Sequence, residues 1–298
     1  MSGVTFTIAR KAGGGLLSKK ISIGNDGKPI SDGSPCRMWS GTARRVVAAD
    51  IHEVAETING MDSSEAMILG TYRPEAETIR LAKDAEADAA KGIYGRTKET
   101  FHYPEGQPGL LLLDHDRKGM PPAVAARIEE LGGPLAAIGY LLGGLEQFAH
   151  VYRPSTSSGI YNEATGERFP GGAGFHVYVI ATDVADSDRF LRALQARAIR
   201  EGLGWGVIMG RGRFGVRSII DIAVGSPERL AFEGKAMVVP PAAQDQSERA
   251  AVAHDGAMID TRAVCPDPTP EEAREVATLI EAERRRLKPE SLTRNPIS

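Results

Sequence analysis

Cysteine is scarce in this chain: among 298 residues only Cys36 and Cys265 occur, far apart in the sequence. Two distant cysteines cannot build a disulfide framework, and no Cys-x-x-Cys pair indicates structural zinc. Apolar runs of about 18 or more residues, which a membrane-spanning helix requires, are absent as well. Residues 1–8 have no basic flank followed by an apolar core, the mark of a secretory signal. We therefore expect a cytoplasmic protein that does not enter membranes.

Aromatic residues make up only 6% of the chain, and the formal net charge is -3. Both values argue against a protein that coats nucleic acid non-specifically, because such binding draws on many phosphate contacts. A local basic stretch is still present, since residues 189–217 contain seven arginines and one acid, Glu201. This stretch is either a solvated helix face followed by a polar hairpin, or part of a groove for a phosphate backbone.

Hydrophobic residues make up 42% and charged residues 25%, enough to bury a sizeable core and stay soluble. The pattern predicts helices over 49–59, 75–90 and 187–201 and strands over 109–114, 175–180 and 218–224. The first of these strands is so apolar that we expect it at the centre of a sheet. Residues 241–268 show no period and are expected as a surface excursion or linker. A last helix, capped by Thr269, follows, and it is compatible with a chain that leads to a further domain of a longer protein.

Asp114 and Asp116 stand two positions apart at the end of the first strand, so their side chains point to the same face. Neighbouring carboxylates repel each other unless a cation lies between them. Hard oxygen ligands at this spacing suit Mg²⁺ or Mn²⁺. The alternative is a pair of solvated aspartates before a turn.

The other two strands also carry a chemically active residue. Asp221 lies among apolar neighbours. Either it is buried, which is costly without a partner such as a metal, or it stands on the solvent face of its strand. His176 is either a phosphate-binding donor beside a metal site or a satisfied core histidine. The hydroxyl-rich residues 155–159 either cradle a phosphate or form an ordinary turn.

The order of these residues resembles the three motifs of the archaeo-eukaryotic primase superfamily, hhhDhD, SxH and hD, where h is hydrophobic. The matching segments end in Asp114-His115-Asp116, contain Gly174-Phe175-His176, and end in Ile220-Asp221. The resemblance covers roughly residues 105–240 and extends to primases of phages, plasmids and mobile elements. One departure is Gly174, where the family often has serine. We interpret residues 160–173 as an inserted hairpin, turning at 162–166, that returns Ser157 or Ser158 to the site.

The resemblance implies an α+β fold, in which an RRM-like βαββαβ module (105–240) packs against a smaller αβ unit (1–100). Together they form a primase-polymerase domain over 1–240, followed by a linker and C-terminal helix over 241–298. It also implies a DNA primase that uses two Mg²⁺ or Mn²⁺ ions, NTPs or dNTPs, a single-stranded DNA template, and a replicative helicase in cis or in trans. The implied metal ligands and catalytic residues are Asp114, Asp116 and Asp221; the nucleotide-binding residues are His176, Ser157, Ser158 and Arg229; the nucleic-acid-binding residues are Arg211, Arg213 and Arg217.

Two other classes of protein stay open. A replication-initiator nuclease requires paired histidines on a strand, and the six histidines of this chain show no such pairing in sequence. A non-catalytic single-strand-binding module requires stacking aromatics and a basic surface. The low aromatic content and the negative net charge argue against such a module, and both classes are less favourable than the primase.

Overall fold

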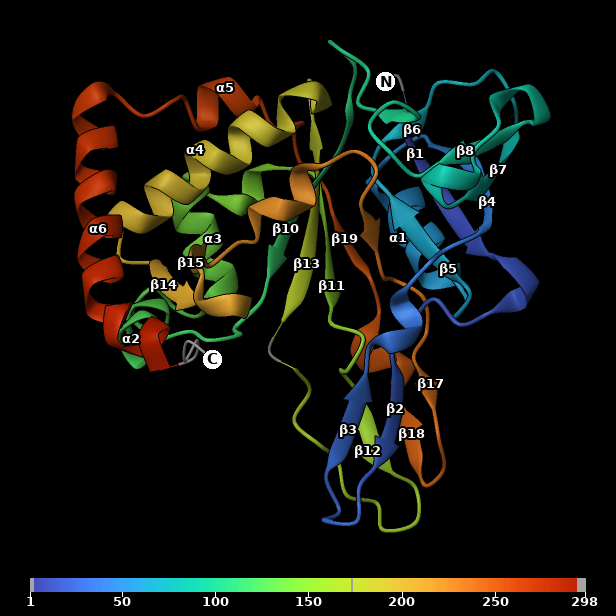
Figure 1. Ribbon diagram of the computed structural model, residues 1–298, viewed down its shortest axis with the longest axis horizontal. Coiled ribbons are helices and arrows are strands. Elements are labelled where there is room, and N and C mark those ends of the chain that lie inside the picture. The colour runs from blue at the N-terminus through green and yellow to red at the C-terminus, as the bar shows by residue number, and fades with distance from the viewer. Residues whose placement is uncertain (1–2, 173, 294–298) are drawn as a thin grey trace.

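The computed structural model describes residues 3–172 and 174–293, and its fold mixes helices with several sheets. A four-stranded sheet stands in the middle of the molecule, with most helices on one side and the N-terminal strands on the other (Figure 1). The α+β class expected from the sequence is therefore confirmed.

The four-stranded sheet is antiparallel throughout. Its strands are, in spatial order, β10 (Gly109–His115), β13 (Phe175–Ala181), β11 (His150–Pro154) and β19 (Val252–His254). In β10, Leu110 to Leu113 are all buried, as the apolar run predicts. The expected central position is wrong, however, because β10 is the outer strand of this sheet. Its open edge is covered by a backbone hydrogen bond of 2.8 Å from the Asp221 N–H to the Asp114 carbonyl.

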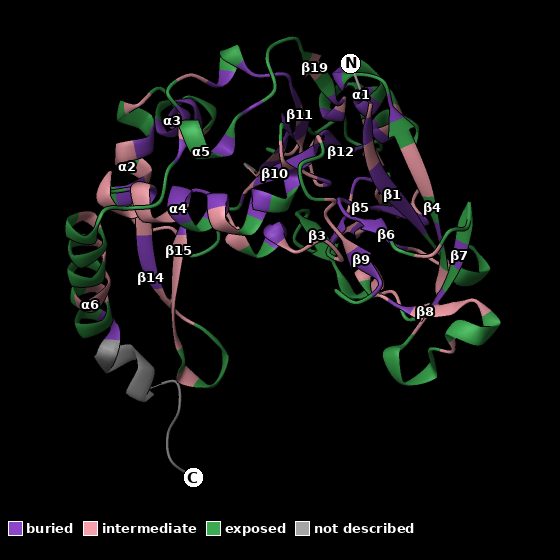
Figure 2. Ribbon diagram, turned by 90° about the horizontal axis from the view of Figure 1, so that it is seen from above, coloured by how far each residue is buried: buried purple, intermediate pink, exposed green. Residues whose placement is uncertain are grey.

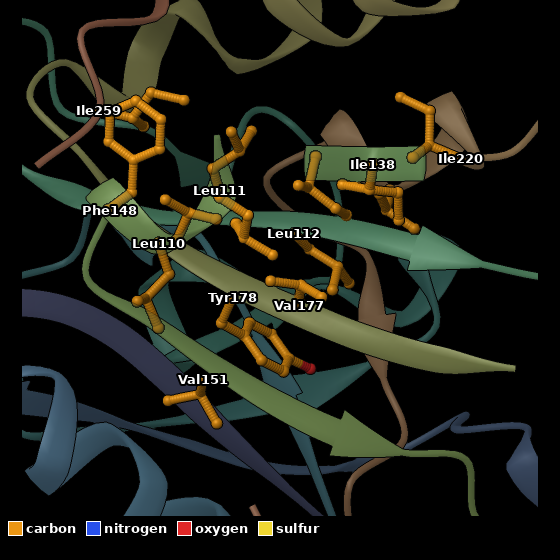
Figure 3. Close-up of a cluster of buried hydrophobic side chains, with 14 of the residues drawn as sticks. Leu110, Leu111, Leu112, Ile138, Phe148, Val151, Val177, Tyr178, Ile220 and Ile259 are labelled. Atoms are coloured by element: carbon orange, nitrogen blue, oxygen red, sulfur yellow. The ribbon is translucent and has the colours of Figure 1, made fainter. Parts of the chain in front are cut away.

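Helices cover one face of this sheet. They are α2 (Pro122–Glu130), α3 (Pro134–Leu142) and α4 (Ser187–Arg200). The amphipathic pattern of α4 is confirmed, since Phe190, Leu191 and Leu194 are buried. Figure 3 shows Ile138 of α3 on this side of the sheet, whereas Val151 and Tyr178 lie on the side toward the N-terminal strands.

A hairpin of β14 (Gly204–Ile208) and β15 (Phe214–Ser218) follows α4. The strand expected over 218–224 is wrong, because β15 ends at Ser218 and Ile222–Gly225 form a 3-10 turn. The carboxylate of Asp221 accepts the backbone N–H of Ala223 at 2.9 Å and so caps this turn. Aspartate favours such local bonds over a continued strand.

The N-terminal strands form a six-stranded sheet beside α1 (Ile51–Gly60), which confirms the helix expected over 49–59. Its strands are, in spatial order, β16 (Leu230–Ala231), β5 (Glu65–Ile68), β1 (Val4–Lys11), β4 (Gly41–Ala48), β7 (Thr78–Ala82) and β8 (Ile93–Gly95). The helix expected over 75–90 is wrong. Ile79 and Leu81 alternate into the core as β7 pairs with β4, so sheet packing overrides the helix propensity of the Ala- and Glu-rich stretch.

Shorter strands complete the fold. They are β2 (Lys20–Ile23), β3 (Pro29–Asp32), β6 (Thr71–Tyr72), β9 (Phe101–His102), β12 (Ile160–Asn162), β17 (Met237–Val238) and β18 (Ala242–Gln244). Strands β2, β3, β12, β17 and β18 form the lower projection in Figure 1. The turn expected at 162–166 is present, closed by a 2.8 Å hydrogen bond from the Gly166 N–H to the Asn162 carbonyl.

The segment 241–268, expected as an excursion or linker, contributes β18, β19 and α5 (Thr261–Val264). Because β19 pairs with β11, this segment is part of the central sheet. The last helix, α6 (Pro270–Thr293), begins after Thr269 as expected. The Thr269 hydroxyl accepts the Glu272 N–H at 3.3 Å, and the Glu272 carboxylate accepts the Thr269 N–H at 2.8 Å.

One continuous hydrophobic core joins the two large sheets: Phe6 and Ile8 of β1 belong to the same cluster as Leu111 and Val177 of the central sheet. Figure 2 shows this buried interior beneath an exposed outer layer. Within the described part of the chain, no helix has the length and apolarity needed to cross a membrane.

Candidate functional site

A cleft of about 470 Å³ lies where the ends of β10 and β13 meet the segment leading into β16. Its lining includes Asp114, Asp116 and His176 from the central sheet and Arg229 and Phe232 from the opposite wall. The cleft therefore lies between the two large sheets.

Asp114 and His176 are directly opposite each other on the paired strands β10 and β13. The Nε2 atom of His176 lies 3.4 Å from Oδ1 of Asp114, and the side chains remain 21% and 24% exposed. Strand alternation explains the arrangement, because Asp114 and His176 share one face with Tyr178 while His115 points to the other. Partial exposure at a cleft wall distinguishes His176 from a core histidine.

Glu233 lies behind His176 and holds it in place. Its side chain is only 1% exposed, and its Oε1 contacts both Nδ1 of His176 and the hydroxyl of Tyr178, the latter at 2.6 Å. Its other oxygen lies 3.3 Å from Arg153 and 3.5 Å from Arg249. The carboxylate thus fixes the imidazole with Nε2 toward Asp114 and the cleft.

Burial alone would lower the pKa of His176, but the carboxylates of Glu233 and Asp114 outweigh it and raise this pKa to about 10. Burial alone would raise the pKa of Glu233, but His176, Arg249 and Arg153 together bring this pKa down to about 2. The pair is therefore an imidazolium and a carboxylate at neutral pH. His176 presents a fixed positive N–H donor to the cleft.

Asp116 and Asp221 flank Asp114 but are more exposed. Oδ2 of Asp116 lies 3.4 Å from Arg217, and Oδ2 of Asp221 lies 3.9 Å from Arg229. The backbone bond to Asp114 places Asp221 beside the end of β10. Asp221 is not among the residues that line the cleft, and its Oδ1 accepts the Ala223 N–H. Across residues 3–172 and 174–293, no three acidic, histidine or cysteine side chains stand close enough to form a ready-made metal cluster. Carboxylate oxygens are suitable ligands for a hard divalent ion. In this structure the carboxylates of Asp116 and Asp221 lie beside arginines.

The hydroxyl-rich loop, which precedes the hairpin over 160–173 in the chain, lies at the cleft. Ser155 and Ser157 line it, with their Oγ atoms 3.0 Å apart, and the Ser155 N–H donates to the Gly174 carbonyl at 3.0 Å. Ser158 lies toward the hairpin instead, where its carbonyl accepts from Gln244 at 2.9 Å. Of the two serines expected, the structure brings Ser157 to the cleft and adds Ser155.

The three expected nucleic-acid-binding arginines separate into two places. Arg217 reaches Asp116 at the mouth of the cleft. Arg211 and Arg213 lie at the turn of the β14–β15 hairpin, outside the cleft lining.

Sequence reasoning missed the roles of Glu233, Arg153 and Tyr178. Glu233 follows a short apolar stretch and precedes a glycine, a pattern common in turns. Its contact with His176 spans 57 positions, so only the folded chain brings them together.

Comparison of the chain with protein-family models, with curated proteins and with solved structures finds no match. The chemistry of the cleft is thus inferred from its own residues. Exposed carboxylates, an imidazolium N–H, an arginine and serine hydroxyl groups suit a ligand that carries both phosphates and a divalent cation.

Proposed function

We propose that this chain is a DNA primase or primase-polymerase, which joins nucleotides on a single-stranded DNA template by metal-dependent nucleotidyl transfer. One observation carries the proposal: Asp114 and His176 stand side by side at a cleft wall, and the backbone of Asp221 is bonded to Asp114. Segments more than a hundred positions apart supply these groups, in the order that the family's motifs follow.

The path of the chain supports the same proposal. Strand β10 is followed by α2, α3, β11, β13 and α4, and the residues after β15 then run beside β10. Strands β10 and β13 are thus neighbours, with β11 and then β19 beyond β13. Paired strands that supply the carboxylate and the imidazole are compatible with the RRM-like βαββαβ module that the resemblance implies.

In the proposed mechanism Asp114, Asp116 and Asp221 would hold two divalent ions. Bound there, the ions would neutralise charge on the attacking 3′-oxygen and on the leaving pyrophosphate. His176 donates its Nε2 proton as a hydrogen bond to a phosphate oxygen of the incoming nucleotide, and Glu233 keeps the ring oriented. Arg229 and the Ser157 hydroxyl bind further phosphate oxygens. Catalysis then consists of positioning and electrostatic stabilisation.

Substitution of Asp114 tests the proposal. Primer synthesis on single-stranded DNA with Mn²⁺ and a mixture of NTPs and dNTPs is expected from the unmodified chain, and Asp114→Asn should reduce it by at least about a hundredfold. Asp188→Asn is the matched control, because Asp188 is an exposed residue of α4 that pairs with Arg192. Equal thermal transitions establish that both variants fold. Synthesis by Asp114→Asn at the control's rate would contradict the assignment.

A further inference from the structure

A second hollow, of about 560 Å³, adjoins the cleft on the side of the β14–β15 hairpin. Lys118, Arg217 and Arg286 line it together with Ile208 and Met209. It continues directly from the cleft, because Asp116 and Arg117 line the cleft and the next residue, Lys118, lines the hollow. Arg217 spans the boundary through its 3.4 Å contact with Asp116.

A third hollow, of about 460 Å³, lies against the same hairpin. Arg284 and Arg285 of α6 line it with Phe214, and Arg284 lies over the Phe214 ring at 5.1 Å. The two hollows share Ile208 and Leu287, so they meet where the hairpin contacts α6. Figure 2 shows the exposed tip of this hairpin projecting away from the rest of the fold.

Charge is concentrated along this path, although the chain as a whole carries -3. Three acids accompany eight basic residues, which are Arg117, Lys118, Arg211, Arg213, Arg217, Arg284, Arg285 and Arg286. The acids are Asp116, Glu281 and Glu283, which pair with arginines of the same path. Among the residues that the structure describes, Arg211 and Arg213 have no ion-pair partner, so their charge is available to a ligand.

We propose that these two hollows form a groove that binds the backbone of single-stranded DNA and leads it to Asp116. This inference rests on the proposed function and adds the location of the template. The arginines suit the phosphates, and the partly exposed Met209 and Phe214 offer apolar contacts that suit unstacked bases. A duplex keeps its bases stacked inside, so it would contact the basic side chains alone.

Because α6 lines both hollows, the last helix contributes to the proposed binding surface.

Oligonucleotide binding tests the groove. Fluorescence anisotropy of a labelled oligothymidine is measured for the unmodified chain and for the triple variant Arg211→Gln, Arg213→Gln and Arg285→Gln. The triple variant should bind at least about tenfold more weakly, and the slope of log affinity against log salt should fall by about 2, because each single-strand phosphate contact contributes about 0.7. A duplex of the same sequence should bind more weakly than the single strand.

The matched control removes three exposed arginines from the N-terminal half of the chain: Arg37→Gln, Arg44→Gln and Arg80→Gln. It should bind the oligonucleotide as the unmodified chain does. The groove proposal is overturned if both triple variants lose the same affinity for the oligonucleotide, or if the groove variant loses none. Tighter binding of the duplex overturns its assignment to a single strand. Primer synthesis, measured separately, distinguishes the two proposals. If the groove variant loses DNA binding but the unmodified chain makes no primers, only the primase proposal is contradicted. If the chain makes primers but the groove variant binds DNA normally, only the groove proposal is contradicted.

Discussion

Glu233 shows how much the candidate site depends on one buried side chain. It contacts His176, Tyr178, Arg153 and Arg249, which come from three separate segments. A buried carboxylate between two arginines and an imidazolium is stable only as a complete set, since loss of one member leaves an unpaired buried charge. The orientation of His176 and the stability of the fold are therefore coupled.

The raised pKa of His176 predicts a pH dependence of stability. A histidine whose pKa is higher in the folded state stabilises the fold fully below its unfolded value of about 6.5, and this contribution is lost as pH rises. With a folded pKa of about 10, the free energy of unfolding should decline between about pH 7 and 9.5, by on the order of a few kcal/mol.

Urea denaturation at several pH values measures this decline. The comparison is His176→Gln, whose side chain does not titrate, so its stability should change less over the same range. The buried His115 and His150 have lowered pKa values because of burial, and their titration affects stability below this window. Parallel pH curves for the two proteins would contradict the imidazolium–carboxylate pair.

Among the elements, the strands β10 and β13 and the helices α1 and α4 follow from sequence because their local pattern and their burial agree. Asp114 and His176 could be selected in advance for the same reason, since both lie at fixed positions on such strands. The errors at 75–90 and 218–224 have another cause. There the pairing of β7 with β4 and the turn capped by Asp221 are decided by contacts that local periodicity does not contain.

A substitution at the turn of the β14–β15 hairpin should affect DNA binding without reducing the stability of the fold. Arg211 has φ 60° and ψ 31°, a left-handed conformation that costs a side-chain-bearing residue about 1 kcal/mol and that glycine adopts freely. Arg211→Gly should therefore leave the free energy of unfolding unchanged or slightly higher, while it weakens oligonucleotide binding. Calorimetry and anisotropy on the same sample check this. A loss of stability with unchanged binding would assign Arg211 to the turn and not to the DNA.

The course of the chain ties its two halves together. After β15, residues 229–233 cross back and β16 pairs with β5 of the N-terminal sheet, before β19 returns to the central sheet. The resemblance separates residues 1–100 from 105–240, but motifs read along the chain do not show a later strand joining an earlier sheet. The hydrophobic cluster that both sheets share has the same origin.

One cooperative unfolding transition is expected from this crossing. Calorimetry of residues 1–298 should give one peak whose calorimetric and van't Hoff enthalpies agree. A fragment of residues 1–104 should not fold, because it lacks β16 and the core side chains of the central sheet. Two resolved peaks, or a cooperatively folding fragment, would show that the halves are independent.

The shared core also fixes the cleft. Its wall at Asp114 and the opposite wall at Ala231 rest on the same packed interior, whereas Leu230 and Phe232 pack into the adjoining cluster of the N-terminal sheet. The entropic cost of bringing these walls to their working distance is thus met during folding, before any ligand arrives. Capture of the proposed nucleotide is accordingly expected to need little reorganisation of the backbone.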